Sequence, residues 1–159
     1  MSTKPWQIVA LATLCFIQAA HLLSEIASDL LVSSNPASAA AWAELGIGAS
    51  DSGADINAVY DYLANSQYIF TIMMVVTFMF GFLLYRGEYL PAVRLTGTIY
   101  FAVGLIGQIF AAGRSADGTP LDSELTSILS MAFTALLLLG FISLFAGKSA
   151  QWVKEHANS

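Results

Sequence analysis

Three ionisable side chains, His21, Glu25 and Asp29, follow one another at intervals of four residues. On an α-helix this spacing places them along one face, because residues four apart are neighbours on the helix surface. An ionisable group inside a membrane helix is a candidate for a proton path or a ligand site. Gln18, three residues before His21, and Gln108, on a later segment, could extend such a path with amide groups.

A structural interpretation of the same residues competes with the functional one, and we weight it more heavily. A neutral histidine can hydrogen-bond to a neighbouring helix, and Glu25 can form an ion pair with Arg114. Arg114 lies 20 residues along its apolar segment from Arg94, which places it at a similar height to Glu25. Both interpretations stay open at this point.

The sequence offers little for a metal site or a covalent reaction. Cys15 is the one cysteine, and His156 lies far from His21 in the polar tail. One helix rarely supplies a complete coordination shell, so we expect no metal. Since no nucleophile stands beside a base and no glycine-rich phosphate loop follows a strand, we expect no catalytic residue and no enzyme. The residues identify no cofactor, and a net charge of −5 argues against nucleic acid.

The elements that position these side chains are apolar helices. The chain is 57% hydrophobic and 11% charged, whereas a soluble domain carries roughly a quarter of its residues as charged ones. Four stretches lack Asp, Glu, Lys and Arg altogether, at 5–24, 62–85, 95–113 and 125–147. Each is long enough to cross a hydrocarbon core, which needs about 20 residues. The sequence predicts one all-α domain over 1–159, with transmembrane helices at about 6–30, 62–85, 92–113 and 124–147.

The basic residues predict the orientation of this four-helix up-down bundle. Five of the six fall on the side of the two termini and the middle turn: Lys4, Arg86, Arg94, Lys148 and Lys154. Only Arg114 falls on the other side. Because Lys and Arg accumulate on the cytoplasmic side, we expect both termini in the cytoplasm. Trp6 and Trp152 flank the first and last spans there, as interfacial anchors do.

The predicted external side has one long and one short connection. Within the long one, alanine-rich residues 37–45 with Trp42 predict a short helix. The second long helix is expected to begin well outside the bilayer, since Ile56, Val59 and Leu63 share a face. This side carries nine acids against Arg114, a charge of −8: Glu25, Asp29, Glu44, Asp51, Asp55, Asp61, Asp117, Asp122 and Glu124. Such a face could attract a cationic partner.

Small residues predict how the helices pack. Gly97, Gly104 and Ala111 recur every seven residues, with Gly107 beside them. Membrane helices associate where small side chains let backbones approach closely, so we expect this face to be a packing seam. The methionines and phenylalanines of the second span could hold a quinone, a carotenoid or an acyl chain, although ordinary packing explains them as well.

The segment 107–120 contains Ala112-Gly113-Arg114 followed by Asp117-Gly118-Thr119-Pro120, and a final apolar helix follows it. This pattern resembles an uncharacterised family of small bacterial four-helix membrane proteins. The resemblance covers the last three helices. It implies a bundle in a bacterial inner membrane and a structural role for Arg114, and it brings no activity with it.

Two hypotheses about function follow from the sequence. The first is a non-catalytic accessory or assembly subunit of a bacterial membrane complex. Such a subunit lies in the lipid bilayer and binds other membrane subunits or copies of itself. The second is a transporter, a channel or a protein that binds a lipophilic ligand (quinone, carotenoid or lipid), using the face of His21, Glu25 and Gln18.

Overall fold

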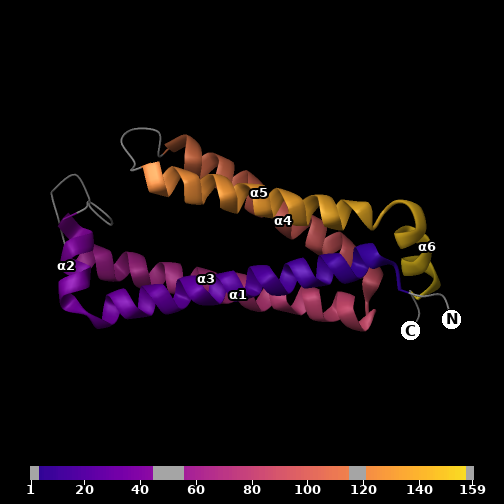
Figure 1. Ribbon diagram of the computed structural model, residues 1–159, viewed down its shortest axis with the longest axis horizontal. Helices are drawn as coiled ribbons and strands as arrows, with labels where there is room; N and C mark the ends of the chain where they lie inside the picture. Colours follow the sequence, from indigo (N-terminus) through magenta and orange to yellow (C-terminus); the bar gives the residue numbers. More distant parts are fainter. Residues whose placement is uncertain (1–3, 45–55, 115–120, 157–159) are drawn as a thin grey trace. The chain divides into compact units, whose positions relative to one another are not determined.

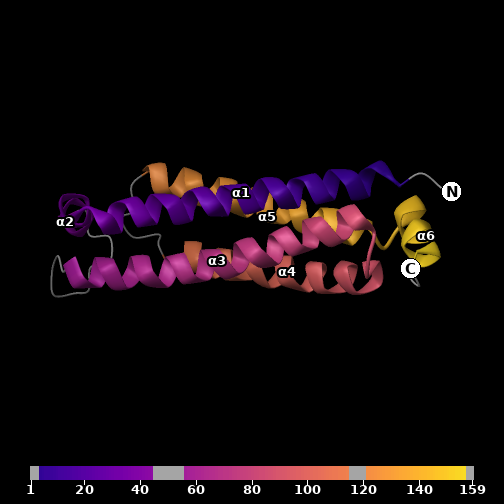
Figure 2. The ribbon, with the colours of Figure 1, turned by 90° about the horizontal axis from the view of Figure 1, so that it is seen from below.

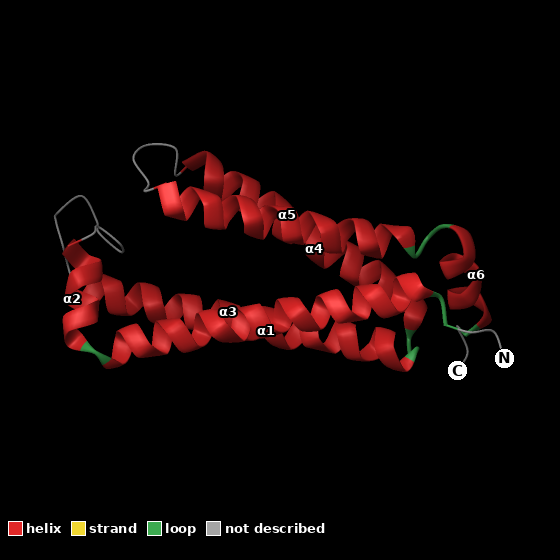
Figure 3. Cartoon of the chain, in the orientation of Figure 1, coloured by secondary structure: helices red, strands yellow, loops and turns green. Residues whose placement is uncertain are grey.

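A computed structural model of the chain describes residues 4–44, 56–114 and 121–156, in which α-helices are joined by short turns (Figures 1 and 3). No strand occurs among the described residues, so the all-α prediction is confirmed. In chain order the helices are α1 (Trp6–Ser34), α2 (Pro36–Glu44), α3 (Ile56–Arg86), α4 (Leu90–Arg114), α5 (Leu121–Ser143) and α6 (Gly147–Glu155).

Three of these helices are long and apolar enough to cross a membrane: α1, α3, and α4 over Leu90–Phe110. A fourth crossing is present if α5 and α6 count as one broken span. Three to four such helices in the described part of the chain indicate an integral membrane protein.

The last predicted span differs from the structure at its end. The apolar run predicts one helix to residue 147, but α5 ends at Ser143 and α6 begins at Gly147, bent away by 63°. After Ser143 the backbone forms i→i−3 turns at Leu144, Phe145 and Ala146, and Gly147, the first residue of α6, has φ +60°, a left-handed conformation that glycine adopts readily. Most residues of α6 are polar, and its buried side chains, Ser149, Trp152 and Val153, lie on one side of the helix.

Close contacts divide the chain into two compact units, and the first of them is Phe16–Met79. In it α1 and α3 run side by side, with α2 beyond the end of α1 (Figure 2). Asn35 caps α2 by accepting a hydrogen bond from the Ala37 N–H (3.1 Å), and Pro36 occupies the first helical position, where it needs no N–H partner. The short helix expected near 37–45 is therefore confirmed.

A small core holds α2 against the end of α3. It consists of Ala39, Ala43, Val59 and Leu63, with Val32, Trp42 and Tyr60 packed around it. At about 1.5 Å per residue, the 29 residues of α1 and the 31 of α3 span about 43 and 46 Å, well beyond a hydrocarbon core of about 30 Å. The α2 end of this unit can therefore stand outside the bilayer.

The second unit comprises Met1–Cys15 and Phe80–Ser159. A cluster of rings joins its helices: Phe80 packs edge-on against Phe141 and Tyr100, and Phe101 stacks on Phe141 at 5.3 Å. Phe141 is fully buried. Offset and edge-to-face arrangements of this kind stabilise aromatic pairs beyond their buried area.

Two basic side chains donate hydrogen bonds to carbonyl groups at the carboxyl ends of helices in the second unit. The Lys4 ammonium donates to the Tyr85 carbonyl at the end of α3 and lies over the ring of Trp152. Burial lowers the pKa of Lys4. Arg94 lies over the Phe145 ring at 4.3 Å and reaches the Leu144 carbonyl just past α5. Cations stabilise helix carboxyl ends, where free carbonyls carry partial negative charge.

Candidate functional site

His21 and Glu25 form a pair on the outward side of α1. The His21 Nε2 and the Glu25 Oε1 lie 3.9 Å apart, and their side chains are 50% and 41% exposed. At about 1.5 Å per residue from Trp6, His21 lies ~22 Å along the helix and Glu25 ~28 Å. For a span that starts at Trp6, these distances would place the histidine within the hydrocarbon and Glu25 near its boundary.

Asp29 lies in a different environment from this pair, because its side chain is buried. It is only 6% exposed, and the Ser66 hydroxyl of α3 donates a hydrogen bond to its Oδ2 at 2.5 Å. The Ser66 oxygen also lies 3.0 Å from the Leu63 carbonyl of its own helix. A hydrogen bond to a carboxylate is among the stronger ones in proteins. Asp29 thus joins α1 to α3, whereas His21 and Glu25 face away.

An apolar groove of about 370 Å³ runs between α1 and α3. Its lining comes from two helices: Phe16, Ala19, Ala20, Leu23, Met74, Val75, Phe78 and Met79. The Phe16 and Phe78 rings meet at 5.4 Å. Met74, Phe78 and Met79 belong to the set that the sequence singled out. The α1 side was missed, although paired alanines between Phe16 and Leu23 are a visible signal.

The polar candidates of α1 do not line this groove. Gln18 is 9% exposed, and neither it nor His21 nor Glu25 borders the groove. Helix geometry explains the separation, because each residue turns the helix by about 100°. His21 lies about 100° around α1 from Ala20, on the side away from Leu23. A ligand in the groove would therefore meet hydrocarbon side chains.

Gln108 makes a polar contact between α4 and α5. Its Nε2 donates to the Ser130 hydroxyl at 3.2 Å, while its Oε1 is buried without a hydrogen-bond partner among the described residues. Hydrogen bonds between membrane helices are commonly worth about 0.6–2 kcal/mol. This geometry fits helix association more directly than a proton path.

We expect a coupling energy of about 1 kcal/mol between Gln108 and Ser130. It is measured from the free energies of unfolding of Gln108→Leu, Ser130→Ala and the double variant by denaturant titration in mixed micelles. Removing one partner already loses the hydrogen bond, so the second substitution should cost less in the double variant than alone. Additive losses would mean that the two side chains do not interact.

The predicted packing residues differ in what they touch. A Cβ atom added at Gly97 would overlap the ring of Phe141, and one added at Gly104 would touch the Thr134 Cγ2 at 4.0 Å. The two contacts are seven residues apart on each helix, as expected for antiparallel neighbours. At Gly107 the added atom would meet nothing within 4 Å. The small-residue face therefore approaches α5 at Gly97 and Gly104, and Gly107 is turned away.

Several predicted residues lie outside the described part of the structure. The side chains of Ala111 and Arg114 are among them, so the ion pair of Arg114 with Glu25 stays a prediction. Of the nine acids, Asp51, Asp55, Asp117 and the side chains of Asp122 and Glu124 are also outside it. Glu44 and Asp61 are described and exposed. Among the described residues, no three His, Cys, Asp or Glu side chains are grouped so that they could hold a metal ion.

In comparisons with protein-family models, with curated proteins and with solved structures, the chain shows no significant match.

Proposed function

We propose that the chain is a multi-pass protein of the bacterial inner membrane that acts as a non-catalytic accessory or assembly subunit. This proposal rests on the outward position of His21 and Glu25. About half of each side chain is left uncovered by the rest of the chain. At the depth of His21 an uncovered polar ring would face lipid, which costs free energy. A polar group on another membrane protein, or on a second copy, would remove that cost by hydrogen-bonding to the pair.

In the proposed topology α1, α3, α4 and α5 are four antiparallel spans with both termini in the cytoplasm. The placement of Lys4, Arg86 and Lys148 on the terminal side supports this orientation. The α2 end then lies outside the cell membrane. Its exposed acids, Glu44 and Asp61, could attract a cationic partner there.

A second function, binding of a lipophilic molecule, is favoured by the groove between α1 and α3. Its volume of about 370 Å³ is within the range of ligand pockets, roughly 300–1,000 Å³. The lining is apolar, so a carotenoid, an acyl chain or a quinone tail would fit its chemistry. His21 and Glu25 lie away from it and would not contact such a ligand.

Site-specific photocrosslinking in native membranes tests the proposal. A photoreactive side chain at Ile17, one turn before His21 and 52% exposed, is expected to give a crosslinked protein of defined mass. The combined variant His21→Leu with Glu25→Leu should remove most of this product, since it removes the polar contact. Thr71→Val, which changes an exposed polar side chain of α3 in the same unit, should leave it unchanged.

A second photoreactive position separates the two functions. Leu23 lines the groove and is 55% exposed. A pigment, quinone or lipid attached reproducibly at Leu23 would support the second function. Lipid adducts alone at Ile17 would contradict the accessory-subunit proposal, because the outward pair would then meet no protein. Persistence of the Ile17 product in the double variant would show that His21 and Glu25 are not what the partner recognises.

A further inference from the structure

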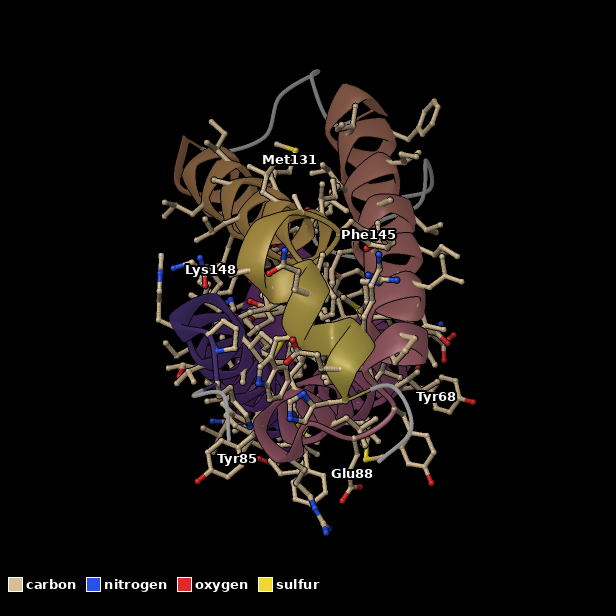
Figure 4. The ribbon with its side chains drawn as sticks, turned by 90° about the vertical axis from the view of Figure 1, so that its right-hand side faces the viewer. Tyr68, Tyr85, Glu88, Met131, Phe145 and Lys148 are labelled. Carbon is tan, nitrogen blue, oxygen red and sulfur yellow. The ribbon has the colours of Figure 1, made fainter. Side chains whose placement is uncertain are left out.

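A polar groove of about 790 Å³ lies at the terminal end of the second unit. Lys4, just before α1, and Trp6 and Gln7, in its first turn, form one side of the groove, and α6 supplies Lys148, Gln151 and Trp152. Figure 4 looks onto α6 and labels Lys148 near the start of that helix. Two ammonium groups and two amides thus face one space, from segments far apart in the sequence.

The conformation of α6 explains why these groups collect there. The helix buries Ser149, Trp152 and Val153 on one side, while Lys148 and Gln151 on the other are exposed. Because α6 turns by 63° from α5, it is suited to lie along a membrane surface with its polar side toward the headgroups. Trp6, 73% exposed, has the position of an interfacial tryptophan.

The charge of the groove favours an anion. Lys4 and Lys148 contribute two positive charges, and Glu155 on the wall contributes one negative charge, which leaves +1. Lys4 is fixed in place by the Tyr85 carbonyl and the Trp152 ring. Lys148 is exposed and is not part of the ion pairs His21–Glu25 and Arg86–Glu88. One ammonium is therefore pre-positioned and the other is available to close on a ligand.

We infer that this groove binds the phosphate of an anionic phospholipid headgroup, with Lys4 and Lys148 on the phosphate oxygens and Gln7 and Gln151 as neutral donors. Basic pockets at the cytoplasmic ends of membrane helices suit such headgroups, because two lysines match their charge while adjacent aromatic rings lie at the depth of the glycerol backbone. This inference does not depend on the accessory-subunit proposal, since it concerns other residues and another kind of ligand.

Lipid binding by the purified protein tests the inference. The protein in neutral detergent is titrated with phosphatidylglycerol or phosphatidylcholine, and bound lipid is counted by native mass spectrometry. We expect preferential retention of phosphatidylglycerol, with Lys148→Gln weakening it about fivefold, which corresponds to the loss of one lysine contact. Lys154→Gln removes the same charge from the same helix outside the groove and should change the affinity less than twofold.

Three results would overturn the inference. Equal losses in Lys148→Gln and Lys154→Gln would mean that general surface charge attracts the lipid. Equal retention of both lipids would mean that the phosphate charge is not recognised. Displacement of phosphatidylglycerol by millimolar inorganic phosphate would assign the groove to a free anion and not to a lipid. Because Lys148 is exposed, its substitution should leave the thermal unfolding midpoint unchanged, which verifies that the variant is folded.

Discussion

Gly97→Ala is expected to destabilise the protein by roughly 1–3 kcal/mol, although alanine favours a helix more than glycine does. The added methyl group would overlap the Phe141 ring. That ring is fully buried and is in contact with Phe80 and Phe101, so it cannot swing into open space. The free energy of unfolding, measured by denaturant titration in mixed micelles, should fall accordingly.

Gly107→Ala is the matched control on the same helix. An added Cβ there meets nothing within 4 Å, so the substitution should be neutral or stabilising by up to about 1 kcal/mol. Combining Gly97→Ala with Phe141→Leu should cost less than the sum of the single variants, because a smaller side chain makes room for the methyl group. A Gly97→Ala protein as stable as the parent would show that α4 and α5 do not approach closely at this point.

The sequence predicted the long helices well because uncharged runs of about 20 residues leave few alternatives in a membrane. The break between α5 and α6 was not predictable in the same way. Residues 125–147 contain no charge and no proline, and Gly147 is tolerated within membrane helices. α5 ends in i→i−3 turns at Leu144, Phe145 and Ala146, and the extended Ala146 and left-handed Gly147 turn the chain into α6, whose Trp152 and Val153 are buried. These features depend on the tertiary structure, which cannot be read from a hydropathy profile.

The spacing in the sequence predicts that His21, Glu25 and Asp29 lie on one face of a helix. In the structure Asp29 lies apart from the other two, and helix geometry explains why. A step of four residues turns a helix by about 400°, so each member is rotated about 40° from the last. Over the two steps from His21 to Asp29 the direction changes by about 80°. His21 consequently stays on the exposed side, while Asp29 reaches the buried side that faces α3. A spacing of four keeps neighbours in contact but does not keep three residues in one environment.

Ser66→Ala is expected to destabilise the protein by about 1.5–3 kcal/mol, the usual range for losing a hydrogen bond to a charged group. The substitution leaves the Asp29 carboxylate buried at 6% exposure without its donor from α3. Ser24→Ala is the matched control, because the exposed Ser24 hydroxyl also donates to a carbonyl of its own helix, that of His21 at 2.7 Å, and no described carboxylate accepts from it. Its substitution should cost less than about 0.5 kcal/mol.

The double variant of Ser66→Ala with Asp29→Leu decides between a structural and a functional Asp29. If the carboxylate serves to join α1 to α3, its removal should recover part of the loss caused by Ser66→Ala, since no charge is then left buried and unpaired. The free energies of unfolding of the four proteins measure this recovery. If Ser66→Ala costs nothing, the hydroxyl does not hold Asp29, and the carboxylate rejoins His21 and Glu25 as a candidate for a proton path along α1.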